Sequence, residues 1–115
     1  MRFSSEHSDN VVVFTLKTPN LDSEISAQVK AELLILCQPD IEALIFDLSN
    51  VKYVDSTGLG ALLLANRQLR EYETPIVLVG VQEMVMKMLN ISQLENIFEY
   101  CNSVDEALEK FGTIA

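Results

Sequence analysis

Two hydrophobic patterns alternate along the chain. Runs of consecutive apolar residues, rich in β-branched and aromatic side chains, occur at residues 11–16, 43–48 and 76–80. Short runs of this kind indicate strands, and those with few polar positions are typical of strands buried on both faces of a sheet. We expect two further strands, one at the sheet edge over residues 2–7 and a short one at Ile97 and Phe98.

Between these strands the apolar residues recur every three or four positions, as they do on one face of a helix. The first such segment has its apolar positions at Ile25, Val29, Leu33 and Leu36. We expect Asp22 or Ser23 to be its N-cap and Pro39 to end it. A shorter helix is predicted from four positions with the spacing of core residues, Met84, Val85, Met88 and Leu89. The last helix follows Ser103, which is expected to form a capping box with Glu106.

The longest helix is predicted after Val54. At about 100° per residue, one stripe of it should face the sheet. The members of this stripe are Gly58, Ala61, Leu62, Ala65, Leu69 and Tyr72. Leu63 and Leu64 fall outside the stripe. They are either covered by a neighbouring helix or exposed, and if exposed they are candidate contacts for a partner.

The predicted order of elements is ββαβαβαβα. Strand–helix–strand units with crossovers of this length imply a largely parallel sheet. The first two strands should pair antiparallel at one edge. We therefore predict an α/β fold with a single domain, residues 1–115, containing a mixed, mostly parallel sheet of four to five strands and four helices.

The charge of the chain narrows the classes of partner. It has 17 acidic against 8 basic side chains and a net charge of −9, which disfavours binding to nucleic acid or to an anionic membrane surface. No stretch approaches the ~20 apolar residues of a membrane span. The first residues have no apolar run typical of a signal peptide. We expect a cytoplasmic, monomeric protein without a cofactor.

The two cysteines, Cys37 and Cys101, lack the spacing of metal ligands or of a redox motif. We expect Cys37 to be a small core residue. The sequence leaves a disulfide between the two cysteines open, and it predicts no metal site.

The stretch D-S-T-G at residues 55–58 joins a predicted strand to the longest helix, where ligand sites lie in open α/β sheets. A hydrolase nucleophile would require G-x-S-x-G and a base. Here Val54 takes the place of the first glycine, and His7 is the only histidine. An aspartic protease loop would have Asp followed directly by Thr or Ser and then Gly, and a P-loop lysine is absent. The turn therefore lacks the residues of a hydrolase nucleophile, of an aspartic protease loop and of a P-loop.

The same turn can cap the helix and can also be modified. A cap from Asp55 or Ser56 contributes about 1 kcal/mol, while Gly58 and Gly60 in the first turn each cost roughly 1 kcal/mol relative to Ala. Glycines there indicate that something approaches the backbone closely or that the sheet packs tightly beneath. A serine at a helix N-terminus tolerates phosphorylation, because free N–H groups and the helix dipole accept the added negative charge.

The motif V-x-Y-V-D-S-T-G-L-G-x-L-L at residues 51–63, which follows L-I-F-D-L, resembles the signature of the STAS domain family, particularly its anti-sigma factor antagonists. The resemblance spans most of the chain, including the N-L-D entry to the first helix and the I-V-L-V-G strand. It implies a STAS-like fold and a binding module rather than an enzyme.

The resemblance also implies a phosphorylation switch. Ser56 would be phosphorylated by a cognate anti-sigma factor that is itself a GHKL-type serine kinase. The unphosphorylated form of this protein would bind that anti-sigma factor and so free the sigma factor. A PP2C-type phosphatase would reset the switch. Thr57 is the second-choice acceptor, and Asp22 is expected beside Ser56. The candidate partner-binding residues are Asp22, Asp55, Ser56, Thr57, Gly58, Leu59, Gly60, Leu63 and Leu64.

Other functions stay open at this point. The family also includes non-phosphorylated subunits of lipid-transport ABC complexes and of larger signalling assemblies. Family members commonly have a glycine before L-D, whereas this chain has Pro19-Asn20, which changes the loop before Asp22. A less favoured alternative makes His7 the phosphate carrier of a sugar phosphotransfer system. Asp47, at a strand end, is expected to hydrogen-bond a loop.

Overall fold

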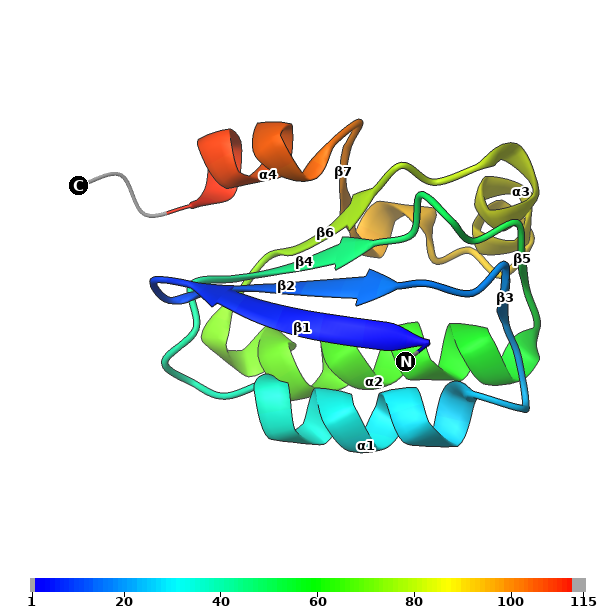
Figure 1. The fold of residues 1–115 in the computed structure, drawn as a ribbon, viewed down its shortest axis with the longest axis horizontal. Helices are drawn as coiled ribbons and strands as arrows, with labels where there is room; N and C mark the ends of the chain where they lie inside the picture. The colour runs from blue at the N-terminus through cyan, green and yellow to red at the C-terminus, as the bar shows by residue number, and fades with distance from the viewer. Residues whose placement is uncertain (1, 113–115) are drawn as a thin grey trace.

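A mixed five-stranded sheet forms the centre of the computed structural model, which describes residues 2–112 (Figure 1). Its strands, in order across the sheet, are β1 (Phe3–Ser8), β2 (Val11–Leu16), β4 (Ala43–Asp47), β6 (Ile76–Val79) and β7 (Glu99–Cys101). Strand β1 pairs antiparallel with β2, and the other neighbours pair in parallel. The predicted α/β class, the antiparallel pair at one edge and the mostly parallel sheet are therefore confirmed.

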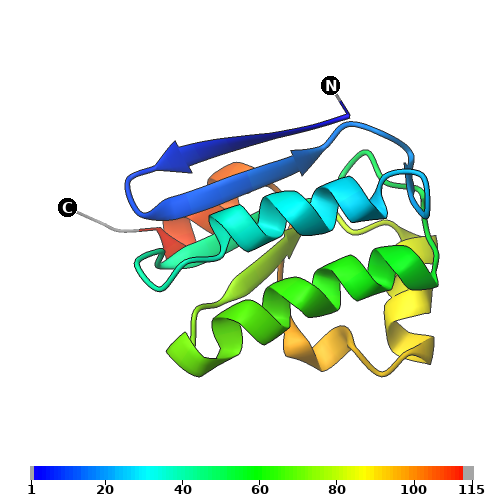
Figure 2. The same ribbon diagram turned by 90° about the horizontal axis from the view of Figure 1, so that it is seen from below.

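The helices lie on both faces of this sheet. They are α1 (Ser26–Leu36), α2 (Ser56–Leu69), α3 (Glu83–Ile91) and α4 (Val104–Phe111), with single 3₁₀ turns at η1 (Arg70–Tyr72) and η2 (Glu95–Ile97). Helices α1 and α2 lie side by side against one face, and α4 covers the other (Figure 1 and Figure 2). Helix α3 lies beyond the strand ends, next to the short strand β5 (Tyr53–Val54).

The core has two layers, one on each face of the sheet. Strand β2 shows the reason, because successive side chains of a strand point to opposite faces. Val12, Phe14 and Leu16 lie in the core beneath α1 and α2, whereas Val11 and Val13 lie in the smaller core beneath α4. The apolar runs thus belong to strands buried on both faces, as predicted.

The start of the first helix differs from the prediction. Helix α1 begins at Ser26 and its N-cap is Ile25, so neither Asp22 nor Ser23 caps it. Asp22 instead makes a local turn, in which its Oδ1 accepts a hydrogen bond from the Glu24 N–H (3.1 Å) and its carbonyl oxygen accepts one from the Ser26 N–H (2.8 Å). Asp side chains favour such turns, which compete with helix formation.

The last strand also differs from the prediction. Residues 95–97 form the 3₁₀ turn η2, and β7 begins at Glu99, so the strand predicted at Ile97 and Phe98 is wrong by two residues. Phe98 is nevertheless buried in the core, which explains its apolar signal. The capping interaction of α4 is confirmed, since the Glu106 N–H donates to Ser103 Oγ at 3.1 Å.

Two side chains expected in the core are exposed. Tyr72 lies in η1, where the chain has left the α-helical spacing, and its side chain is 45% exposed. Met84 lies in the first turn of α3 and is also 45% exposed, while Val85 and Leu89 of the same helix are buried. The periodicity held for the helix interiors and failed at their ends.

The remaining expectations concern the cysteines and the strand end. Cys37 and Cys101 are both free and buried, so the core prediction for Cys37 is confirmed and no disulfide joins them. Asp47 Oδ1 accepts a hydrogen bond from the Ser49 N–H (3.0 Å), as expected of a strand-end acid. Within residues 2–112, no helix combines the length and the apolar character that a membrane crossing requires.

Candidate functional site

The loops before α1 and α2 meet at the carboxyl ends of the central strands. The carbonyl oxygen of Pro19 accepts hydrogen bonds from the N–H groups of Lys52 (2.7 Å) and Tyr53 (3.2 Å). Leu21 O accepts one from the Asp55 N–H (3.2 Å). The same loops contain a small parallel sheet, in which β3 (Asn20–Leu21) pairs with β5. The residues before α1 are therefore fixed against the start of α2 (Figure 1).

Asp55 is the N-cap of α2, as one of the two predicted choices. Its Oδ1 accepts hydrogen bonds from the Gly58 N–H (2.9 Å) and from Thr57 Oγ1 (2.5 Å). The Thr57 hydroxyl is the main reason that the pKa of Asp55 lies below its usual value; backbone N–H groups of Gly58, Ser23 and Thr57 lower it further, and partial burial opposes them. The cap is thus an ionised carboxylate that draws hydrogen bonds from both loops.

Ser56 and Thr57 have different environments although they are neighbours. Ser56 is exposed, and within the described residues its hydroxyl has no hydrogen-bond partner. Thr57 is partly buried and its hydroxyl is bonded to Asp55. Only the Ser56 oxygen is therefore free to react with or bind to an approaching molecule.

Gly58 is required by close packing. A Cβ placed there would lie against the carbonyl oxygen of Leu21, and at 2.6 Å from Val54 Cγ2 and 2.8 Å from Leu21 Cγ. Real Cβ atoms do not approach other atoms so closely, so only glycine fits beneath the loop. This confirms the sequence-based explanation of a close approach at Gly58.

The rest of the predicted surface divides into buried and accessible positions. Leu59 is buried in the main core, so its side chain offers no surface to a partner. Leu63 and Leu64 are half-buried, with α1 lying alongside α2 (Figure 2). Asp22 is also half-buried, and the carbonyl oxygen of its neighbour Leu21 accepts the Asp55 N–H, so the loop that contains Asp22 lies against the start of α2.

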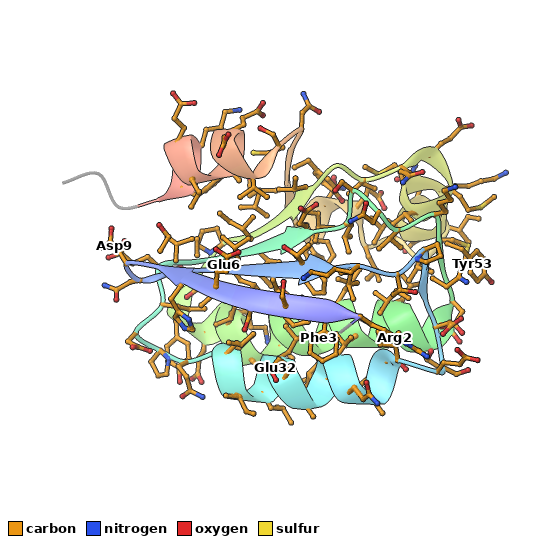
Figure 3. The ribbon with its side chains drawn as sticks, viewed as in Figure 1. Arg2, Phe3, Glu6, Asp9, Glu32 and Tyr53 are labelled. Carbon is orange, nitrogen blue, oxygen red and sulfur yellow. The ribbon has the colours of Figure 1, made fainter. Side chains whose placement is uncertain are left out.

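The sequence did not identify three further side chains at this end of the molecule. Tyr53 of β5 is 44% exposed (Figure 3), and Met84 is exposed on α3, the helix next to β5. Val54 of β5 is buried, so its neighbour Tyr53 points to the other side of the strand. The third is Lys30 of α1, whose Nζ would be 3.4 Å from a Cβ at Gly60.

Neither His7 nor a metal-binding cluster lies at this turn within the described residues. His7 is exposed on the edge strand β1, opposite Val12 of β2, on a different part of the molecule. Residues 2–112 contain no group of three or more His, Cys, Asp or Glu side chains that could hold a metal ion. They also enclose no pocket for a small molecule. What the described residues present at this turn is the exposed hydroxyl of Ser56 beside the Asp55 cap.

The fold and this turn are those of a STAS domain. The model of the STAS domain family matches residues 2–107, and the chain therefore belongs to this family. The resemblance of residues 51–63 and the predicted STAS-like fold are both confirmed.

Several proteins that are similar to this chain are named anti-sigma factor antagonists. The chain is 30% identical, over 95 residues, to the anti-sigma-B factor antagonist of Listeria monocytogenes, with 83% of this chain and 82% of the relative covered. An anti-sigma factor antagonist from Mycobacterium paratuberculosis has a similar crystal structure, with a TM-score of 0.82, 22% identity and coverage of 96% and 93%. SpoIIAA from Bacillus in its phosphorylated form superposes with a TM-score of 0.75, at 22% identity and coverage of 94% and 97%.

Proposed function

We propose that this protein is an anti-sigma factor antagonist that binds an anti-sigma factor kinase and is switched off by phosphorylation of Ser56. Its similarity to the Listeria antagonist supports the class. The exposed hydroxyl of Ser56, free of hydrogen bonds within residues 2–112, supports the position of the switch. The protein acts by binding, in the cytoplasm, and catalyses no reaction of its own.

The contrast between Ser56 and Thr57 carries this proposal. A kinase needs a hydroxyl that can enter its active site and give up its proton. The Thr57 hydroxyl is bonded to the Asp55 carboxylate at 2.5 Å and is partly buried, so its use would break the cap of α2. Ser56 can be modified with every hydrogen bond of the turn intact.

The chemistry requires ATP and a kinase of the GHKL type. The Ser56 oxygen attacks the γ-phosphorus of ATP, the bond from that phosphorus to the β-phosphate oxygen breaks, and ADP leaves. The hydroxyl proton passes to a base of the kinase. A phosphatase of the PP2C type reverses the modification by transferring the phosphoryl group to water.

The modification changes the binding surface more than the fold. Phosphorylation adds a charge of about −1.5 to −2 next to the Asp55 carboxylate. The free N–H groups at the start of α2 tolerate this charge. A kinase that lies over Asp22, Asp55 and Gly60 and contacts the accessible parts of Leu63 and Leu64 then meets a bulky dianion in the middle of its contact surface.

The experiment begins with the protein recovered from its own cells. Intact mass and peptide mapping should show one phosphate, on Ser56, and the copurifying kinase should bind purified Ser56→Ala but not Ser56→Asp in isothermal titration. Both variants should have the melting temperature of the parent protein. Equal affinity of the two variants would contradict the switch. Recovery of transport subunits with an unmodified chain would indicate a structural STAS subunit instead.

A further inference from the structure

The side chain of Lys30 on α1 reaches across to α2. A Cβ at Gly60 would be 3.4 Å from Lys30 Nζ and 3.6 Å from its Cε, so the end of the lysine lies over the first turns of α2. The residue is half-buried, although lysine is normally exposed. Within residues 2–112 its ammonium forms no ion pair, in a chain with 17 acidic side chains.

The register of the two helices directs this ammonium toward Ser56. Helices α1 and α2 run parallel, side by side (Figure 2), and Lys30 and Gly60 are each the fifth residue of their helix. Ser56 lies four residues before Gly60, on the same face, with about 5–6 Å between such Cβ positions. Helical side chains tilt toward the N-terminus, which for Lys30 is the direction of Ser56. Gly60 has no side chain that would stand between them.

We propose that Lys30 is the counter-ion that binds the phosphate of phosphorylated Ser56. The proposal deepens the proposed function and rests on it for the modification itself. A phosphate on Ser56 lies within reach of the ammonium after rotation of the last bonds of the lysine. Its three N–H groups donate to phosphate oxygens and offset the repulsion from the Asp55 carboxylate.

Other charged groups near this turn remain constant between the variants that test the proposal. On the two loops and the segments beside them these groups are Arg2, Asp22, Glu24, Lys52 and Asp55, and on α3, which packs against β5, they are Glu83 and Lys87. Arg2 lies 3.7 Å from Glu24 in an exposed ion pair, and neither residue is changed in any of the variants.

The test uses the full chain with phosphoserine incorporated at position 56 during synthesis, so that no kinase is needed. A ³¹P NMR titration measures the second pKa of the phosphate. A nearby ammonium favours the dianion, so this pKa should be about 0.2 to 0.7 lower in the parent chain than in Lys30→Met. Lys30→Arg should keep the lower pKa. Lys110→Met removes the same charge on α4, across the sheet, and should leave the pKa unchanged.

Equal phosphate pKa values in the parent chain and Lys30→Met would overturn the proposal. The proposal would also be overturned if the phosphate pKa rose as much in Lys110→Met as in Lys30→Met, because the effect would then be one of net charge. Thermal unfolding of the unphosphorylated variants checks the fold, and the midpoints should agree. The titration does not depend on whether cells phosphorylate Ser56, so its failure and that of the proposed function are separate results.

Discussion

Gly58→Ala is a one-carbon change whose effect should be opposite to that expected from helix propensity. In an open helix the replacement of Gly by Ala stabilises, by about 1 kcal/mol. At position 58 the added Cβ meets Leu21 O, and Val54 Cγ2 and Leu21 Cγ at 2.6 and 2.8 Å. The carbonyl belongs to the loop before α1 and accepts the Asp55 N–H, so the loop cannot move away without weakening that hydrogen bond.

The magnitude follows from these opposing effects. Overpacking typically costs 1–3 kcal/mol of stability. The Cβ at position 58 overlaps three atoms at once, one of them in the backbone, so we expect a cost of about 3 kcal/mol. After subtraction of the gain of about 1 kcal/mol in helix propensity, Gly58→Ala should lower the free energy of unfolding by about 2 kcal/mol. For a domain of this size that corresponds to a melting temperature roughly 8 °C lower.

Gly60→Ala is the matched control on the same helix. There the nearest atoms are Lys30 Nζ at 3.4 Å and Cε at 3.6 Å, the flexible end of a side chain that can shift. The free energy of unfolding of Gly60→Ala should therefore be about 0.5–1 kcal/mol higher than that of the parent. Urea unfolding followed by circular dichroism measures both variants. The packing argument would be refuted if Gly58→Ala were as stable as the parent. It would also be refuted if the free energies of unfolding of Gly58→Ala and Gly60→Ala changed in the same direction.

Two further predictions concern titratable groups. Asp55→Ala should lower the free energy of unfolding by about 1 kcal/mol at pH 7. Because the folded-state pKa of Asp55 is lowered, this stabilisation is present above the ordinary pKa of 3.8 and is lost as the pH falls below 3.8. Urea unfolding at pH 7 and at pH 3 should therefore show the free energies of unfolding of the variant and the parent converging at the lower pH. Burial raises the pKa of Cys37 from 9.0 to about 11, which reduces its thiolate about 100-fold at pH 8. Alkylation of Cys37, followed by peptide mapping, should be at least that much slower in the native protein than in urea, and equal rates would contradict its burial.

The sheet and the helix interiors were predictable because their signals are local. The apolar run at residues 43–48 indicated a strand by its length and composition, and β4 covers Ala43–Asp47. The missed features depend on contacts distant in sequence. Strand β3 has two residues and exists because the two loops meet, and no periodicity can be read from two residues. The start of α1 depends on whether Asp22 bonds to the helix or to its own turn.

The candidate site was predictable in location and less so in detail. The order strand, D-S-T-G, helix placed it at the carboxyl ends of the strands. Which of the three polar residues would cap α2 depends on backbone angles, and Asp55 is extended at that point while Ser56 is already helical. The approach of Lys30 to Gly60 depends on the relative register of two helices, which neither helix contains in its own sequence.

Each residue at the start of α2 has a separate role, and this separation explains how one serine can be altered safely. Asp55 caps the helix, Thr57 holds the Asp55 carboxylate, and Gly58 lets the Leu21 loop pack against the helix. Ser56 takes part in none of these interactions within the described residues. A change confined to Ser56 therefore leaves the cap, the loop and the packing intact. A substitution at any of the three neighbours would alter the fold of the turn and the binding surface together.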